Sequence, residues 1–284
     1  MPSRWTGVPI SAEPHSRPRR GDSARSLMNT VVGEFVLPAN GWVWTHAMLR
    51  ALELFDVDDA ATRQALFRTA AGGLLEREQQ GRRVRWRLSS VGRRAGVVGA
   101  ERVYSFRSAG NGWDGRWLLL DVSVPDDLLR VRLRRRLAWA GFGSLPSGLA
   151  ITPHADREPE ALRILKSLGL ETHAVSLIAR LGTIGHAKRV IAEAWDLGEL
   201  ALRYKEFVAE VAKQRPTTEE ETFVAHTRLV HEWRRFPFFD PGLPIELLPR
   251  HWIGLEAKKV FDRHYAKWKP AATRWFAAVN TDAG

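Results

Sequence analysis

Hydrophobic residues in the N-terminal third of the chain recur at the spacing of two short helices. The first helix is predicted over about residues 45–55, with Thr45 as its N-cap. Its apolar stripe consists of Ala47, Met48, Ala51, Leu52 and Phe55. Asp58 is the expected N-cap of a second helix, which runs through Ala70 and ends at Gly72-Gly73. Two helices joined by a tight turn are therefore expected.

A strict alternation of apolar and basic residues follows these helices. Val84, Trp86 and Leu88 alternate with Arg83, Arg85 and Arg87, and successive side chains of a strand point to opposite faces. The pattern predicts a β-hairpin whose apolar side chains pack inward and whose arginines line the outer face. Helix, turn, helix and basic hairpin together predict a winged helix-turn-helix DNA-binding domain over residues 25–107.

Residues 113–182 show an order of elements that is typical of a ferredoxin-like domain. A buried strand is expected over 117–124, and a helix with an apolar ridge follows Pro125. Two short strands around 142–145 and 149–152, a helix over 158–168 and a strand over 171–180 complete the order βαββαβ. Both helices would cover one face of the sheet, which leaves the other face free to dimerise or to bind a ligand.

The chain over residues 185–280 is expected to form an all-α domain. Helical apolar spacing covers the segments 186–213, 219–235 and 254–278, and segments that contain proline, 215–218 and 236–244, divide them. Thr218 and Glu221 form a capping box for the second of these helices. The predicted fold class is α+β, with an N-terminal winged helix-turn-helix, a central ferredoxin-like (βαββαβ) domain and a C-terminal all-α domain.

Composition and charge indicate what kind of partner the chain binds and where it acts. A net charge of +11 and a pI near 10.6 favour a polyanionic partner or an acidic ligand. The lack of cysteine excludes disulfides and thiolate metal sites and is typical of a reducing compartment. Residues 1–24 combine four prolines with several arginines and are expected to form a disordered basic arm. Because no apolar run reaches the roughly 18 residues of a membrane span, a cytoplasmic protein is expected.

The second predicted helix and the hairpin carry the residues expected to bind double-stranded DNA. Arginine and glutamine can make bidentate contacts to base edges, threonine can contact an edge or a phosphate, and arginines of a wing can hold the backbone. The expected DNA-binding residues are Thr45, Thr62, Arg63, Gln64, Phe67, Arg68, Arg82, Arg83, Arg85 and Arg87. Two alternatives stay open: a winged domain that contacts another protein, and an edge strand whose charge only prevents aggregation.

Two further basic clusters are candidates for an effector site. Residues 130–136 hold five arginines, a density that fits a solvated helix face as well as an anionic ligand or DNA backbone. Residues 231–235 close a later helix, where cations also complement the helix dipole. The candidate effector-binding residues are Arg134, Arg135, His231, Trp233, Arg234 and Arg235. No cofactor is expected and no metal site, because His226 and His231 are five residues apart and lie on different faces of the helix.

Five motifs, in their order and spacing, resemble the PaaX-like family, the repressors of phenylacetic acid degradation. They read GWVW (41–44), WDGRW (113–117), LRRRLAWAGFG (133–143), LVHEWRRFP (229–237) and DPGLP (240–244), within a resemblance that covers about residues 27–265. The resemblance implies a bacterial transcriptional regulator, usually a repressor, that acts as a homodimer and has the three domains predicted above, the central one similar to a CRISPR-associated nuclease fold. It also implies a small-molecule inducer, because the best-known member is released from DNA by phenylacetyl-CoA, an aryl-CoA thioester.

The expected function is repression of an aromatic-compound catabolic operon through a palindromic operator. A homodimer would read half-sites about 34 to 36 Å apart, or a multiple of that distance. An enzyme is the weaker class, because the chain has no nucleophile elbow, no phosphate-binding glycine loop and no carboxylate pair at telling spacing. Two other functions stay open: a metal-dependent nuclease that uses carboxylates such as Asp121 in the ferredoxin-like domain, and a ligand-independent DNA-binding protein.

Overall fold

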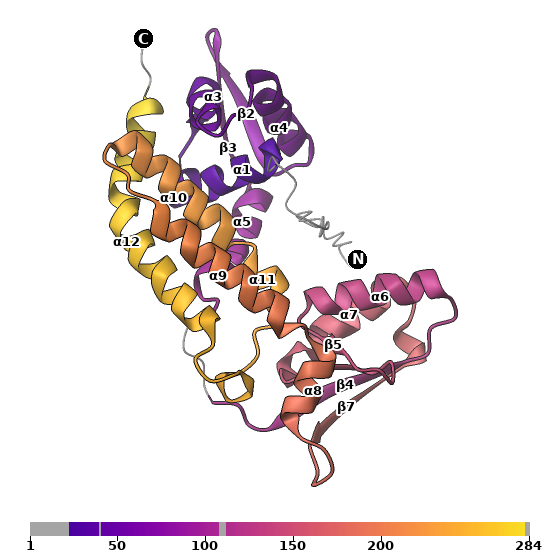
Figure 1. Cartoon of the computed structure of the whole chain (residues 1–284). Helices are drawn as coiled ribbons and strands as arrows, with labels where there is room; N and C mark the ends of the chain where they lie inside the picture. The colour runs from indigo at the N-terminus through magenta and orange to yellow at the C-terminus, as the bar shows by residue number, and fades with distance from the viewer. Residues whose placement is uncertain (1–22, 40, 108–111, 282–284) are drawn as a thin grey trace. The chain divides into compact units, whose positions relative to one another are not determined.

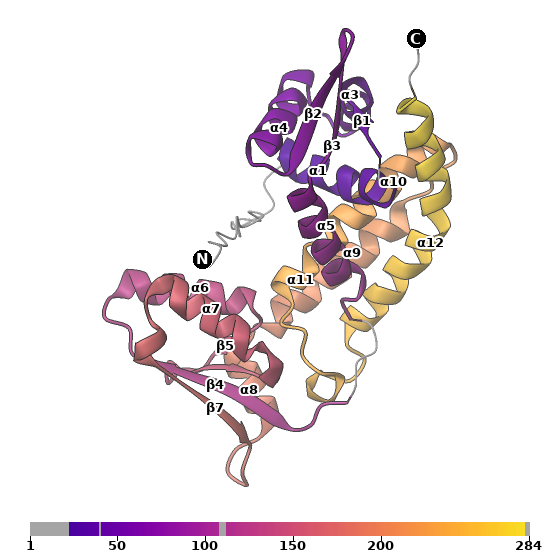
Figure 2. The same cartoon turned by 180° about the vertical axis from the view of Figure 1, so that it is seen from behind.

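The computed structural model describes residues 23–39, 41–107 and 112–281, and the chain divides into two compact units (Figure 1, Figure 2). The first combines Met1–Val98 with Thr218–Thr227 and Lys269–Gly284, and the second combines Gly99–Thr217 with Arg228–Trp268. The predicted basic arm over residues 1–24 lies, except for its last two residues, outside the described residues. None of the helices in the described ranges is long and apolar enough to cross a membrane.

The N-terminal part of the first unit consists of helices followed by a hairpin. Its elements are α1 (Ala24–Val31), the π-helical turn η1 (Val32–Val36), α2 (Leu37–Ala39), β1 (Val43–Trp44), α3 (Thr45–Glu53), α4 (Asp59–Ala71), β2 (Leu75–Gln80) and β3 (Arg83–Leu88). The strands form an antiparallel sheet in the order β1-β3-β2. The two predicted helices and the hairpin are confirmed, whereas the helical segment from Ala24 was not anticipated, although its apolar residues already recur at helical spacing.

Of the two N-caps predicted for α3 and α4, one is confirmed and one is wrong. Asp58 caps α4, because its carboxylate accepts a hydrogen bond of 2.7 Å from the backbone N–H of Ala61. The prediction for Thr45 is wrong, since Trp44 is the N-cap of α3 and makes no side-chain capping bond. The Thr45 hydroxyl instead donates to the carbonyl oxygen of Val84 and accepts from the indole N–H of Trp86, both at 2.9 Å. Thr45 therefore fastens the start of α3 to strand β3.

Segments from the end of the chain complete the first unit. The side chain of Asn280 donates to the Trp42 carbonyl at 2.8 Å and accepts from the backbone N–H of Trp44 at 2.9 Å. The buried Glu34 carboxylate lies 2.7 Å from His226 Nε2 and 2.9 Å from Lys269 Nζ. Burial by itself would raise the pKa of Glu34, but the His226 hydrogen bond and the Lys269 charge outweigh it and lower that pKa. The N-terminal part of the first unit is thus tied to helices that are remote in sequence.

Helix α5 (Ser90–Tyr104) follows the hairpin and packs closely against Leu74, the residue before β2. A Cβ placed on Gly92 would lie 2.0 Å from the carbonyl oxygen of Leu74, so only glycine fits there. At Gly99 of the same helix a Cβ would meet nothing within 4 Å.

The sheet of the second unit is built in the order βαββαβ. Its elements are β4 (Arg116–Val122), α6 (Asp127–Trp139), β5 (Gly143–Ser144), β6 (Ala150–Thr152), α7 (Glu158–Leu168) and β7 (Ala174–Arg180). The four strands are antiparallel in the order β5-β6-β4-β7. Helices α6 and α7 cover one face of the sheet over Leu118 and Leu120 (Figure 1), and Ile191 of α8 (Ala187–Ala194) packs on the other face against Trp117.

The remaining chain is helical, as expected. It comprises α9 (Leu197–Lys213), α10 (Glu219–Trp233), the short α11 (Phe236–Phe239) and α12 (Ile253–Val279). The single helix predicted over 186–213 is wrong, because Asp196 accepts from the N–H of Glu199 at 2.9 Å and begins α9 as a separate helix. The capping box is confirmed by reciprocal bonds of 3.2 and 3.1 Å between Thr218 and Glu221.

A buried ion pair joins the segment after α5 to the segment after α11. The Asp240 side chain is 0% exposed; its carboxylate forms a bidentate pair with Arg107 and accepts a hydrogen bond from the hydroxyl of Tyr204 at 2.6 Å. Close by, His154 Nε2 lies 2.9 Å from the Gly242 carbonyl oxygen. Burial, together with the charge of Arg157, lowers the pKa of His154 below its usual 6.5.

Candidate nucleic-acid interface

Helix α4 presents a polar face to solvent and an apolar face to the core. Arg63, Gln64, Phe67 and Arg68 are exposed, at the i, i+1, i+4 and i+5 spacing of one helix face. The guanidinium of Arg63 is half-exposed and lies 3.6 Å from the Asp59 carboxylate one turn earlier. Such a surface ion pair is weak, so the Arg63 guanidinium can exchange Asp59 for another acceptor.

Thr62 does not belong to this face. Its side chain is 0% exposed and lies among the buried residues of α4, with Ala65, Leu66 and Thr69. The expectation that Thr62 contacts DNA is therefore wrong, because the folded domain turns it toward the core.

Phe67 links helix α4 to the hairpin. It is 52% exposed, and its ring meets the buried ring of Trp86 edge-on at a centroid distance of 5.4 Å. The guanidinium carbon of Arg77, on β2, lies 5.9 Å from the same centroid. Phe67 thus holds a fixed position at the surface, where its apolar face can contact a ligand.

Arg85 and Arg87 of the hairpin lie opposite carboxylates of the neighbouring strand. In the register of β2 and β3, Glu78 stands opposite Arg85 and Glu76 opposite Arg87. The resulting ion pairs measure 2.6 and 2.7 Å. The expectation that Arg85 and Arg87 contact phosphate therefore needs correction, since both guanidinium groups already bind carboxylates of the neighbouring strand, at shorter distances than the 3.6 Å between Arg63 and Asp59. Glu76 and Glu78 are visible in the sequence, and the register set by the turn at Gly81 would have indicated both pairs.

Both paired arginines also stack on an aromatic ring. The guanidinium carbons of Arg85 and Arg87 lie 4.4 and 4.8 Å from the ring centroid of Trp42. The arginines and Trp42 therefore stiffen the base of the hairpin.

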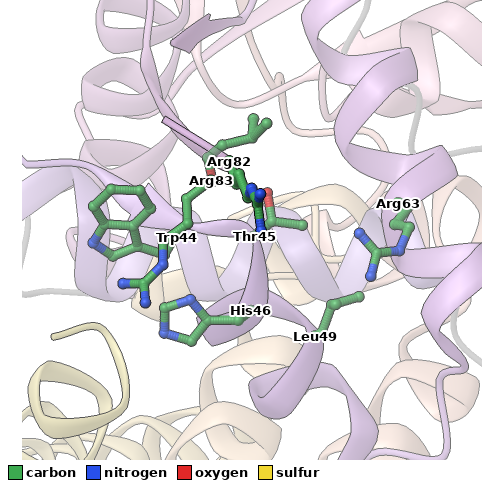
Figure 3. Close-up of a pocket in the computed structure, with 8 residues that line it drawn as sticks. Trp44, Thr45, His46, Leu49, Arg63, Arg82 and Arg83 are labelled. Carbon is green, nitrogen blue, oxygen red and sulfur yellow. Dashed lines mark hydrogen bonds between the residues drawn. The ribbon is translucent and has the colours of Figure 1, made fainter. Parts of the chain in front are cut away.

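Arg82 and Arg83, at and just after the turn of the hairpin, line a cavity of about 430 Å³ (Figure 3). Its further lining comes from α4, α3, β1 and β3: Arg63 on α4, Thr45, His46 and Leu49 on α3, Trp44 on β1 and Val84 on β3. Figure 3 shows Trp44 and His46 on one side, Arg63 on the opposite side and Thr45 between them. Three guanidinium groups from two elements thus converge on one hollow beside the exposed face of α4, an arrangement that fits a phosphodiester group. Sequence reasoning missed Trp44, His46 and Leu49, which only the fold brings to this place.

The aromatic residue of the expected effector site is part of the core. Trp233 is 0% exposed; its ring stacks on Phe261 at 4.7 Å, and its indole N–H donates to the Val103 carbonyl at 3.1 Å. The expectation that Trp233 stacks on a ligand is therefore wrong. His231 is likewise buried, at 3% exposure.

The basic residues of the expected effector site are accessible to different degrees. Arg134 and Arg135 are exposed on α6, and Arg234 is half-buried. Arg235 pairs with Glu232 at 3.3 Å, and its guanidinium carbon lies 5.8 Å from the ring centroid of Phe239. Sequence reasoning missed Arg203, whose guanidinium carbon lies 4.7 Å from the same centroid of Phe239, a ring that is 38% exposed.

Asp121 is exposed on β4. This is the carboxylate that the alternative function of a metal-dependent nuclease would need. Within the described ranges, no group of three or more His, Cys, Asp or Glu side chains could hold a metal ion.

Comparison with known proteins gives matches along most of the chain. The family model described as "PaaX-like protein" matches residues 23–92, "PaaX protein central Cas2-like domain" matches 110–191 and "PaaX-like protein C-terminal domain" matches 195–278. The "Transcriptional repressor PaaX" of Escherichia coli (strain K12) is 29% identical over 261 residues, covering 88% of this chain and 82% of that protein. A solved structure, "Uncharacterized protein Rv0674 from Mycobacterium tuberculosis", matches with a TM-score of 0.62 and 22% identity, covering 91% of this chain and 99% of that one. This last likeness concerns the fold alone.

Proposed function

The chain belongs to the PaaX-like family, and from this premise we propose that it is a bacterial transcriptional repressor that binds double-stranded DNA. The observation that carries the proposal is the exposed face of α4 beside the cavity that Arg63, Arg82 and Arg83 line. The homologous repressor supports a regulator rather than an enzyme. A DNA partner would place the protein in the cytoplasm.

The two parts of this surface would contribute differently to binding. Helix α4 would enter the major groove, where Arg63, Gln64 and Arg68 can form hydrogen bonds to base edges and confer sequence preference. Arg82 and Arg83 would hold phosphates beside the groove, which adds affinity that does not depend on sequence. Arg85 and Arg87 would act indirectly, because they keep the hairpin in shape.

The arrangement of elements supports the finer fold assignment. The order helix, strand, helix, helix, strand, strand with sheet order β1-β3-β2 is that of a winged helix-turn-helix, and we assign it to residues 25–107. The antiparallel order β5-β6-β4-β7 supports a ferredoxin-like domain over 113–182. The C-terminal all-α domain would span 185–280, although its helices contribute segments to both compact units.

We further propose that the protein binds a palindromic operator as a homodimer and is released by a small-molecule inducer. An aryl-CoA thioester would suit the second unit, because its phosphates need arginines and its acyl group needs aromatic surface. The exposed arginines Arg134 and Arg135 and the pair Arg203 and Arg235 above Phe239 are the candidates for that site. The inducer can shift the equilibrium between two dimer states only by the difference between its affinities for them.

A binding assay tests the proposed function. Fluorescence anisotropy compares the DNA upstream of the protein's own gene with a scrambled duplex of the same length, at one fixed salt concentration. We expect the wild type to bind the natural duplex clearly more tightly than the scrambled one. In Arg63→Ala, this difference in binding free energy should fall by about 1 to 3 kcal/mol. A panel of CoA thioesters and the matching free acids then identifies the inducer. Equal affinity for both duplexes at this salt concentration would overturn the proposal.

A further inference from the structure

Phe67 is a large apolar side chain on the otherwise polar exposed face of α4. Its ring is 52% exposed, and Phe67 is the only exposed Phe, Tyr or Trp among the described residues of the first unit. Arg63, Gln64 and Arg68 lie beside it on the same helix face. Phe67 is therefore the one large apolar group that α4 offers to a ligand.

Two neighbours hold the ring of Phe67 in one orientation. The ring of Trp86, which is 1% exposed, meets it at an interplanar angle of 90°. Trp86 is itself fixed, since its indole N–H donates to the Thr45 hydroxyl at 2.9 Å. Arg77 adds a cation 5.9 Å from the ring centroid of Phe67. Because a ring held in this way has little side-chain freedom left to lose, burial of its exposed part on binding adds directly to affinity.

Small residues before and after Phe67 on α4 leave the ring accessible. Ala60 lies two turns before Phe67 and Ala71 one turn after it, and both alanines are exposed. Each alanine projects only a methyl group, so neither shields the ring from a surface that surrounds the helix. The major groove of DNA, about 12 Å wide, is such a surface for an α-helix about 10 to 12 Å in diameter.

We propose that Phe67 binds the 5-methyl group of a pyrimidine in the major groove, which unmodified DNA supplies as thymine. This methyl is the apolar group that the base edges present in the groove, and phenylalanine is one of the side chains that contact it. The role rests on the proposed function and deepens it, because Phe67 would determine sequence preference without forming a hydrogen bond. Arg63, Gln64 and Arg68 would read the polar edges of neighbouring base pairs.

The spacing on α4 also predicts where the methyl group lies. Phe67 follows Arg63 by four residues, which is about 6 Å along the helix axis. Base pairs repeat about every 3.4 Å along the duplex. The thymine should therefore lie within about two base pairs of the position at which Arg63→Ala relaxes the sequence preference.

Replacement of thymine by uracil tests the proposal, because uracil lacks the methyl group and keeps the polar edge of thymine. Fluorescence anisotropy compares the duplex upstream of the protein's own gene with the same duplex in which uracil replaces every thymine. Loss of one buried methyl group should weaken binding about fourfold, and about 15-fold if each copy in a homodimer contacts one methyl group.

Variants of the full-length chain assign this effect to Phe67. Phe67→Ala should bind the thymine and uracil duplexes with nearly equal affinity. Val97→Ala is the matched control, since it truncates a side chain of α5 that is 53% exposed in the same unit, and it should keep the wild-type ratio of affinities. Phe67→Leu retains an apolar side chain and should retain a preference for thymine, so it serves if circular dichroism shows that Phe67→Ala is misfolded.

Two further sets of duplexes identify the base. Single uracil substitutions should reduce affinity at one thymine in each half-site. A duplex with 5-methylcytosine in place of every cytosine distinguishes the second source of the methyl group. Unchanged affinity for this duplex assigns thymine, and a gain that Phe67→Ala abolishes assigns 5-methylcytosine.

The same titrations separate this inference from the proposed function. If the wild type binds the thymine, uracil and 5-methylcytosine duplexes equally, or if Phe67→Ala keeps the wild-type preference for thymine, the inference is overturned. Either result together with tighter binding of the natural than of the scrambled duplex would leave the repressor proposal standing. Equal binding of those two duplexes, with a methyl effect that depends on Phe67, would do the reverse.

Discussion

Arg82 and Arg83, at and just after the turn of the hairpin, should supply most of the salt-dependent affinity of the hairpin for DNA. The test is the double substitution of Arg82 and Arg83 by alanine, two residues that line the cavity beside α4. If each guanidinium neutralises one phosphate, each contributes about 0.9 to the slope of log K against log salt. The variant should therefore lose about 1.8 from that slope.

The slope translates into affinities at chosen salt concentrations. The salt-dependent part of log K is zero at 1 M salt, because log salt is zero there. The double variant should therefore lose about 60-fold in affinity at 0.1 M salt and about ninefold at 0.3 M. At 0.1 M this is about 2.5 kcal/mol. Because phosphate contacts carry no sequence information, the loss should be equal on the natural and the scrambled duplex.

Fluorescence anisotropy titrations between 0.1 and 0.4 M salt measure the slope. Lys188→Ala with Arg189→Ala on α8 removes the same charge from exposed positions of the second unit and should leave the slope unchanged. Arg85→Ala with Arg87→Ala removes the same charge from the same strand, and its loss of slope should be smaller, since Glu78 and Glu76 already neutralise these arginines. If this last variant lost more of the slope than the variant without Arg82 and Arg83, the assignment of phosphate contacts to Arg82 and Arg83 would be refuted.

Three further predictions concern stability. Gly92→Ala should destabilise the protein by about 1 to 3 kcal/mol, because its Cβ would meet a backbone carbonyl, whereas Gly99→Ala in the same helix should stabilise the protein by up to about 1 kcal/mol; urea unfolding compares the two. Asp240→Asn leaves a buried guanidinium without its carboxylate and should cost about 3 to 5 kcal/mol in thermal unfolding. Asp262→Asn, at a half-exposed carboxylate that pairs with Lys258, should cost at most about 1 kcal/mol; equal effects would contradict the buried ion pair. His154 binds a proton less readily in the folded than in the unfolded chain, so stability should be fully present above pH 6.5 and fall as the pH drops below that value; His154→Gln should flatten this part of the pH profile measured by thermal melts.

The sequence by itself determined the local elements of this protein. Asp58 as a helix cap, the Thr218 and Glu221 capping box and the strand alternation around Trp86 depend on residues within a few positions of each other, so their patterns predicted them correctly. The family motifs were recognised for a similar reason, since order and spacing along the chain suffice to match them. The helical segment from Ala24 carried the same kind of signal and could have been predicted.

Only the tertiary structure decided which side chains reach the surface of the candidate site. Thr62 and Trp233 have residue types that suit DNA or ligand contacts, but each lies on the helix face that another element covers. Arg85 and Arg82 have the same charge, yet the strand register gives Arg85 a carboxylate partner and leaves Arg82 at the cavity. The physical reason is that burial and ion pairing depend on contacts between residues distant in sequence, and no local pattern specifies which segments the fold brings together.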